Sequence, residues 1–310
     1  MDGPKNVRTD LVKSCSDWTW FQGLGMARSI VKGGIQTTGF DINPTALTAL
    51  AESGGTATTS AKEAANGSDI LAAVVVNADQ TRDVLFGERG VASVMKPGGV
   101  IISCATMAPS NAKALANEAE ALGLLYLDAP MSGGAAKAAI GQLTFMASGT
   151  AQAFERAKPV LDLVAGKVYN LGDAAGAGAS FKMVNQLLAG VHIAAACEAM
   201  TFAAKLGLDL EKVYEVITAS AGNSWMFENR VPHILEGDYA PRSAISIFTK
   251  DLGIVSDMAR QEKFPLQIAS TALQMFLMTA AAGMDGDDDA SVARMIAEIT
   301  GLELPAQEMS

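Results

Sequence analysis

The stretch GGVIISCATMAPSNAKALANEAEALGLLYLDAP, residues 98–130, decides the fold class. It places a short apolar run, a helical pattern and a second apolar run in succession. Such alternation implies a crossover between parallel strands, and nearly continuous apolar runs are typical of strands buried on both faces. Similar apolar runs occur at residues 35–40, 70–76 and 143–149, with another helical pattern at 43–55. The first half therefore predicts a Rossmann-type α/β domain with a parallel sheet.

After about residue 172 the pattern becomes helical only. A long helical segment runs to Gly207, and Gly and Pro separate the helical patterns that follow it. Those patterns cover residues 209–221, 248–263, 265–282 and 289–300. The sequence thus predicts two domains, an NAD-binding Rossmann-like domain over 1–173 and an all-helical domain over 174–310 for substrate binding and oligomerisation.

Composition and charge exclude several classes of protein. The chain has 310 residues, 49% hydrophobic and 18% charged, and a formal net charge of −10. Phosphate-rich partners are repelled by such a charge, which argues against a nucleic-acid or anionic-membrane surface. An odd number of cysteines without a CxxC pair favours a reducing cytoplasm. The start MDGPKNVRTD lacks a signal-peptide core, and His192 and Glu198 interrupt the most apolar segment. A soluble cytoplasmic protein is expected.

Asp41 is the candidate residue for binding a dinucleotide ribose. It follows the run TTGF and lies 18 residues after Gly23 (41 − 23), close to the spacing at which an acid accepts hydrogen bonds from ribose hydroxyls. An acid there repels a 2′-phosphate, so the pattern favours NAD over NADP. The alternative is that Asp41 caps the helix beginning near Pro44.

The glycine-rich phosphate turn that should precede Gly23 is missing. If Gly23 is its third glycine, the first two positions hold Trp18 and Trp20, whose indoles would block a pyrophosphate. Because the only Trp codon is TGG, reading one base later turns each into a glycine codon. We therefore hypothesise a compensated frameshift over roughly residues 13–22, which resequencing the gene tests. The alternative is a chance pair of tryptophans, with the pyrophosphate site lost.

Two further turns follow apolar runs. Ser132, Gly133 and Gly134 offer a hydroxyl and unshielded backbone amides, which suit a substrate carboxylate; the alternative is a flexible turn. Thr106 follows the run VIISCA, at the end of a strand where ligands bind in open parallel sheets. The alternative is that Thr106 belongs to an ordinary polar turn and contacts no ligand.

Lys182 and Asn185 lie three residues apart in GAGASFKMVNQ, residues 176–186, and so share a helix face. A lysine on an apolar helix face is costly unless paired or deprotonated, and desolvation lowers a lysine pKa toward that of a general base. The alternative is a lysine that extends to solvent.

Lys250 stands beside Asp251 in FTKDLG. It either reaches an anionic ligand or pairs with a neighbouring acid. The acidic run DGDDD, residues 285–289, does not match a calcium loop, because Ala290 and Ile296 occupy the positions that need glycine and glutamate. A solvated turn that caps the last helix is expected there, and no metal site.

Three segments together resemble the β-hydroxyacid dehydrogenases, relatives of 3-hydroxyisobutyrate dehydrogenase and tartronate semialdehyde reductase. They are DAPMSGGAAKAAIGQLTFMASG, GAGASFKMVNQLLAG and KDLGIV. The match runs from residue 23 onward in the right order. VLFGERGVA, NQLLAGVHIAA, GNSWMFENR and FPLQIASTALQMF look like the branch that oxidises L-threonate.

The resemblance implies a role for each matching position. Lys182 matches the catalytic lysine, Ser132–Gly134 the substrate-carboxylate loop, and Asn185 the helix residue that holds the substrate. Cofactor-contacting positions are matched by Gly23, Gly25, Asp41, Thr106 and Lys250, the last of which reaches the active-site cleft from the helical domain.

The implied activity is NAD-dependent oxidation of the 2-hydroxyl of L-threonate, with Lys182 as general base, in a homodimer or homotetramer. A 3-hydroxyisobutyrate dehydrogenase, a tartronate semialdehyde reductase and a non-catalytic paralogue remain alternatives.

Overall fold

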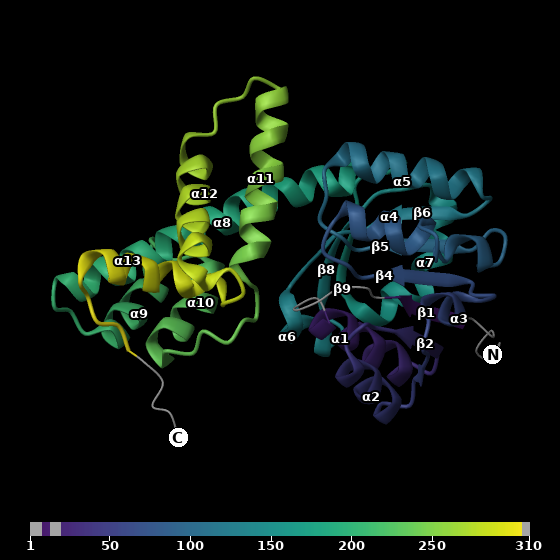
Figure 1. The fold of residues 1–310 in the computed structure, drawn as a ribbon, viewed down its shortest axis with the longest axis horizontal. Coiled ribbons are helices and arrows are strands. Elements are labelled where there is room, and N and C mark those ends of the chain that lie inside the picture. The colour runs from purple at the N-terminus through teal and green to yellow at the C-terminus, as the bar shows by residue number, and fades with distance from the viewer. Residues whose placement is uncertain (1–7, 13–19, 306–310) are drawn as a thin grey trace. The chain divides into compact units, whose positions relative to one another are not determined.

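The structure is a computed structural model that describes residues 8–12 and 20–305 (Figure 1). The contacts within the chain divide it into two compact units, Met1–Met183 and Val184–Ser310. This division falls inside one helix. The boundary expected after residue 173 stays a prediction.

The first unit is built on a six-stranded sheet with the order β3-β2-β1-β4-β5-β6. Every pairing in it is parallel, which confirms the predicted Rossmann-type fold. The strands are β1 (Arg8–Val12), β2 (Gln36–Phe40), β3 (Thr56–Ala57), β4 (Ile70–Ala73), β5 (Val100–Ser103) and β6 (Leu125–Asp128).

Helices cover both faces of this sheet (Figure 1). Ile70 and Ile102 contribute to one core cluster together with Met26 and Val160, whereas their strand neighbours Leu71 and Ile101 face a second cluster. All eight residues of β4 and β5 are buried, which explains their apolar runs. The helices are α1 (Trp20–Lys32), α2 (Pro44–Glu52), α3 (Ala61–Ala65), α4 (Ala78–Phe86), α5 (Pro109–Ala121), α6 (Gly134–Ala139) and α7 (Ala151–Val164).

A smaller sheet extends the first unit. It has the order β7-β8-β9 and consists of β7 (Met131–Ser132), β8 (Leu143–Ala147) and β9 (Ala165–Asn170). β7 runs antiparallel to β8, and β9 runs parallel to it. The short β7 is therefore fixed by hydrogen bonds to β8, which holds the turn that follows it.

The second unit is helical, as predicted. Its helices after α8 (Ala177–Lys205) are α9 (Leu210–Thr218), α10 (Trp225–Glu236), α11 (Ile245–Gln261), α12 (Gln267–Thr279) and α13 (Val292–Thr300). α8 is long and apolar enough to cross a membrane, with a mean hydropathy of 1.6 in its most apolar window, but half of that window is buried in the protein. It packs Ile193, Cys197 and Met200 into the core of this unit, as a core helix does.

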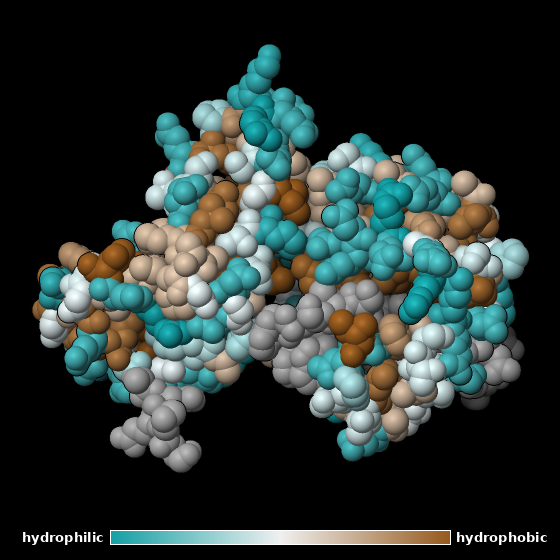
Figure 2. Space-filling model, viewed as in Figure 1, coloured by the Kyte–Doolittle hydropathy of each residue, from teal (hydrophilic) through white to brown (hydrophobic). Residues whose placement is uncertain are grey.

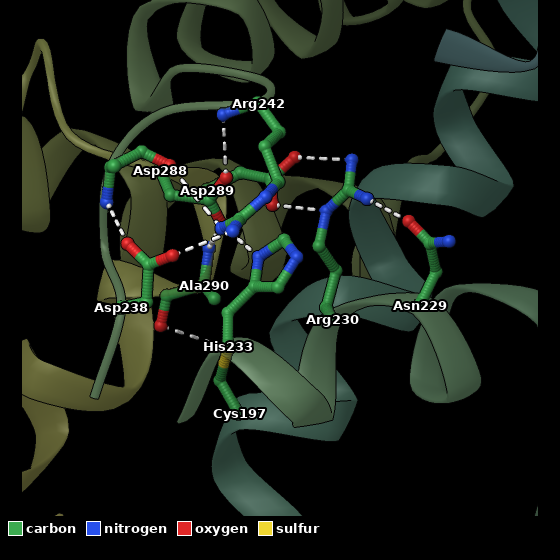
Figure 3. A network of polar contacts seen from close by, with 10 residues as sticks. Cys197, Asn229, Arg230, His233, Asp238, Arg242, Asp288, Asp289 and Ala290 are labelled. Carbon is green, nitrogen blue, oxygen red and sulfur yellow. Dashed lines mark hydrogen bonds and ion pairs between the residues drawn. The ribbon is translucent and has the colours of Figure 1, made fainter. Parts of the chain in front are cut away.

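The acidic run at residues 285–289 is the predicted solvated turn only in its first part, where Asp285 and Gly286 are exposed. Asp288 and Asp289 are completely buried. Asp288 caps the short helix Asp289–Ser291 by accepting a hydrogen bond from the Ala290 amide. Asp289 pairs with Arg230 of α10, and Asp288 with His233 of the same helix (Figure 3). The prediction was wrong for Asp288 and Asp289, because their partners lie more than 50 residues earlier in the chain.

Asp289 binds Arg230 through both carboxylate oxygens (Figure 3). The Nε–Oδ1 and Nη2–Oδ2 distances are 2.5 and 3.1 Å. Burial raises the pKa of Asp289 to about 6, although the Arg230 charge opposes that shift. His233 Nδ1 lies 2.8 Å from Asp288 Oδ1. Burial alone would raise the pKa of Asp288. The hydrogen bond from His233 and the electrostatic interaction with that side chain outweigh burial, so the pKa of Asp288 is lowered.

Candidate active site

A pocket lies at the carboxyl end of β2, within the first unit. Its lining includes Gly23 and Leu24 of α1, Phe40 at the end of β2, Asp41 directly after it, and Leu47 of α2. In doubly wound sheets, ligands bind beyond the carboxyl ends of the strands. Asp41 is the acid among these lining residues, and its predicted contact with a ribose stays a prediction.

Asp41 is not the cap of α2. The N-cap is Asn43, whose side chain accepts a hydrogen bond from the Thr45 amide at 3.0 Å. Asp41 Oδ1 instead accepts a hydrogen bond from the Asn43 amide at 2.9 Å, and Asp41 is 8% exposed. This contact fixes the carboxylate beside the pocket, and the capping alternative is wrong.

The two glycines of α1 have different surroundings. Gly23 lines the pocket. A Cβ on Gly25 would lie 2.8 Å from backbone atoms of Ala138 and Ala139 in α6, so Gly25 allows α1 and α6 to pack closely. Its predicted cofactor contact stays a prediction. Trp18, and most of the segment in which we hypothesise a frameshift, lie outside the described residues.

The turn after β7 requires its glycines. Gly133 and Gly134 have φ values of +129° and +65°, a region that side chains rarely adopt. A Cβ on Gly133 would also lie 2.6 Å from the Lys137 Cβ. Ser132 therefore leads into a turn of defined backbone shape that ends at the first residue of α6.

Lys182 is brought next to this turn. Its side chain comes from the second turn of α8, is 7% exposed and donates a hydrogen bond from Nζ to the Met131 carbonyl oxygen at 2.8 Å. Met131 directly precedes Ser132. The structure thus places the predicted base beside the predicted carboxylate loop, 51 residues apart in the chain, instead of extending the amine into solvent.

Asn185 and Lys250 belong to the second unit, where a chain of polar contacts connects them. Asn185 Nδ2 donates to Gln186 Oε1 at 3.0 Å, and Gln186 Nε2 donates to Asp251 Oδ2 at 2.5 Å. Lys250 Nζ lies 2.5 Å from Asp251 Oδ1. Lys250 therefore pairs with a neighbouring acid, as the alternative interpretation of the sequence predicted. The predicted contact of Lys250 with a ligand stays a prediction.

The sequence reasoning missed Gln186 and Asp251. Both are buried, Asp251 completely. The signal available for Asp251 was an acid beside Lys250 on an otherwise apolar helix face, because a buried carboxylate needs a partner. Gln186 follows Asn185 directly, and nothing in its spacing distinguished it.

Thr106 lies in the loop after β5 and is half-buried. In a parallel sheet this loop opens at the same edge as the one after β2. Its predicted contact with the cofactor stays a prediction.

Comparisons with known proteins extend over nearly the whole chain. Residues 22–172 match the family model for the NAD-binding domain of 6-phosphogluconate dehydrogenase. Residues 176–296 match the one described as NAD-binding of NADP-dependent 3-hydroxyisobutyrate dehydrogenase. An L-threonate dehydrogenase from Cupriavidus necator is 50% identical over 285 residues, which cover 92% of this chain and 95% of that protein. The chain belongs to the 3-hydroxyisobutyrate dehydrogenase-like family.

Solved structures of the family agree with this assignment. The crystal structure of a 3-hydroxyisobutyrate dehydrogenase from Salmonella typhimurium is 49% identical with a TM-score of 0.88, and the match covers 93% of this chain and 99% of that one. A 3-hydroxyisobutyrate dehydrogenase from Mycobacterium tuberculosis, solved with L-serine, is 29% identical with a TM-score of 0.78, covering 94% and 99% of the two chains.

Membership in the 3-hydroxyisobutyrate dehydrogenase-like family confirms the predicted resemblance. It makes the protein an oxidoreductase of the NAD(P)-dependent hydroxyacid dehydrogenases. A hydroxy-acid substrate follows from the family.

Proposed function

We propose that this protein oxidises the 2-hydroxyl of L-threonate to 2-dehydro-L-erythronate, with NAD as the oxidant. The observation that carries the proposal is the hydrogen bond from Lys182 Nζ to the Met131 carbonyl, because it holds an amine beside the Ser132–Gly134 turn. The choice of L-threonate is supported by relatives of that name at about 50% identity over nine-tenths of the chain.

Each part of this site has one task. The backbone amides and hydroxyl of Ser132–Gly134 hold the substrate carboxylate. Lys182 accepts the proton of the 2-hydroxyl at Nζ, which a positioned base accelerates by about 10²–10⁴-fold. Bound NAD supplies the hydride acceptor for the hydrogen on C2. The substrate thus loses one proton and one hydride, and its alcohol becomes a ketone.

Asn185 and Lys250 are proposed to complete the site. Asn185 would hold the substrate, and Lys250 would bind an anionic group of the cofactor or substrate. Their contacts with Gln186 and Asp251 restrict both side chains, which supports a positioned role for each. Gly23, Gly25 and Thr106 are proposed cofactor contacts.

NAD is proposed over NADP because Asp41 lies at the pocket beyond β2. We expect Asp41→Asn to lower kcat/KM with NAD by roughly 10–100-fold, since a hydrogen bond to a charged group contributes about 1.5–3 kcal/mol. The loss with NADP should be smaller, because an amide does not repel the 2′-phosphate. Initial rates with both cofactors measure the ratio.

Glu52→Gln is the matched control for this prediction. It removes the same charge from an exposed position at the end of α2. In this control, the ratio of kcat/KM with NAD to kcat/KM with NADP should equal that of the unaltered protein. An unchanged ratio in Asp41→Asn itself would remove Asp41 from cofactor selection.

Kinetics with a substrate panel test the proposed substrate. Protein from a resequenced gene is assayed with L-threonate, 3-hydroxyisobutyrate, L-serine and, in the reducing direction, tartronate semialdehyde. We expect the highest kcat/KM with L-threonate. The Salmonella relative carries the name 3-hydroxyisobutyrate dehydrogenase at similar identity, so a higher value with 3-hydroxyisobutyrate would replace the proposed substrate by that one.

Titration with NADH, followed by fluorescence, tests the non-catalytic alternative. Trp18 and Trp20 stand where the pyrophosphate loop should be, and they are the reason for this alternative. Saturable binding with turnover supports the dehydrogenase. If NADH does not bind up to millimolar concentration, the polypeptide with this sequence is a non-catalytic paralogue.

A homodimer or homotetramer in the cytoplasm is also proposed. Apolar side chains lie on the surface of the second unit (Figure 2). On α8 they form an exposed stripe of Val184, Leu188 and Phe202, each at least 48% exposed. Light scattering gives the assembly mass, and a monomer mass would contradict this proposal.

A further inference from the structure

The carboxylate of Asp128 is bound to the start of α8. Asp128 is the last residue of β6 and is 2% exposed. Its Oδ2 accepts hydrogen bonds from the amides of Gly176 and Ala179, at 2.8 and 2.9 Å. The first amides of a helix have no partner within it, so a carboxylate there both satisfies them and complements the helix dipole. Burial raises the pKa of Asp128, against those hydrogen bonds.

Ser148 makes a second contact of the same kind. Its hydroxyl is buried, accepts a hydrogen bond from the Gly178 amide at 2.9 Å and donates one to Asp128 Oδ2 at 3.3 Å. A Cβ on Gly178 would lie 2.3 Å from the Met146 carbonyl oxygen and 2.8 Å from that of Asp128. The first turn of α8 therefore lies directly against the ends of β6 and β8.

These contacts and the Lys182 hydrogen bond close a ring. Lys182 is three residues after Ala179, so the two lie one helical turn apart on the same face. Its Nζ binds the carbonyl of Met131, which is three residues after Asp128 in the chain. The segment 128–131 and the start of α8 are thus joined at two points, Asp128 and Met131. Any shift of the first turn of α8 relative to Asp128 moves Nζ relative to the Ser132–Gly134 turn.

We propose that Asp128 is a positioning residue for catalysis, which sets the place of the Lys182 amine through the first turn of α8. This inference rests on the proposed role of Lys182 as the base. An apolar residue at position 128 would avoid the cost of burying a carboxylate, but it would leave the amides of Gly176 and Ala179 without an acceptor. Asp128 does not itself exchange a proton with the substrate.

Asp128→Ala and Asp128→Asn are compared under substrate saturation. Asp128→Ala removes the acceptor and should lower kcat by about 100-fold, the effect of a displacement on the order of 1 Å. The KM for NAD should stay unchanged, since Asp41 follows a different strand, β2. Asp128→Asn keeps an oxygen that accepts the same two amides and should restore most of kcat. With C2-deuterated substrate, the isotope effect on kcat should rise in Asp128→Ala, because the chemical step becomes slower.

A double-mutant cycle separates positioning from a general loss of structure. In the Lys182→Ala background, Asp128→Ala should cause no further loss, because the amine that it positions is gone. An equal fold-loss in both backgrounds would overturn the proposal, as would a wild-type kcat in Asp128→Ala. Asp173→Asn, which removes an exposed carboxylate near the same helix start, is the control for charge and should leave kcat unchanged.

Three further outcomes concern the folding of the variant and the assignment of the base. If Asp128→Ala is unfolded at the assay temperature by circular dichroism, Ser148→Ala takes its place in the cycle, and non-additivity with Lys182→Ala is again expected while additivity overturns the proposal. If Lys182→Ala alone keeps wild-type turnover, the base assignment and this inference both fail. An inactive Lys182→Ala with an additive Asp128→Ala overturns the positioning role only.

Discussion

Lys182→Ala is expected to lower kcat for L-threonate by about 10²–10⁴-fold, the usual contribution of a positioned general base. The variant removes the amine that binds the Met131 carbonyl and leaves Asp41 and the pocket beyond β2 in place. NADH should therefore bind with its wild-type affinity. Initial rates and a fluorescence titration measure the two effects separately.

A small amine should restore part of this activity. Lys182 is 7% exposed, so its truncation leaves a cavity beside the Ser132–Gly134 turn into which methylamine fits. Lys205→Ala, at the exposed end of the same helix, is the matched control and should keep full turnover. Wild-type turnover in Lys182→Ala would exclude lysine from the mechanism.

Arg230→Met is expected to destabilise the protein by about 3–5 kcal/mol, the cost of leaving a buried carboxylate without its partner. Asp289 is completely buried and binds Arg230 through both oxygens. Urea unfolding at about pH 8 measures the loss. Arg260→Met is the control, because Arg260 and Asp257 are both largely exposed and such pairs contribute within about 1 kcal/mol.

The same variant should show a characteristic dependence on pH. The pKa of Asp289 is already raised to about 6 by burial, and loss of the Arg230 charge raises it further. The folded protein then holds a proton that the unfolded chain releases above about pH 4, so the variant loses stability as the pH rises. Its deficit should be smaller at about pH 5 than at about pH 8. An equal deficit at both would show that packing, and not charge, causes the loss.

The sequence predicts elements whose burial follows a simple period. The structure has strands at the predicted apolar runs, β4 and β5, and helices at the predicted helical patterns, α2 and α5. These elements could be predicted because a strand covered on both faces and an amphipathic helix each leave a pattern within a single segment. β9 has no apolar run. It is a strand because it pairs with β8, and a partner elsewhere in the chain leaves no period in the segment itself.

The candidate site also has some features that the sequence predicts and others that it does not. Lys182 and the Ser132–Gly134 turn are identifiable from helix spacing, glycine content and the family resemblance. The acceptor of the Lys182 hydrogen bond is a backbone carbonyl, and Asp128 binds backbone amides. Every residue except proline has both of these backbone groups, so the residue type does not predict such contacts. The burial of Asp288 and Asp289 could not be predicted either, since their partners Arg230 and His233 come from α10.

The course of α8 has a consequence for exchanging halves between relatives. The two units meet between Met183 and Val184 inside one unbroken helix, so no surface loop offers a neutral crossover point there. A crossover at residues 171–176 would transfer Lys182 with the helical half while leaving Asp128 and Ser148 to the other parent. Functional chimeras should therefore inherit residues 128–148 and 176–183 from the same parent, whatever the origin of the remaining chain.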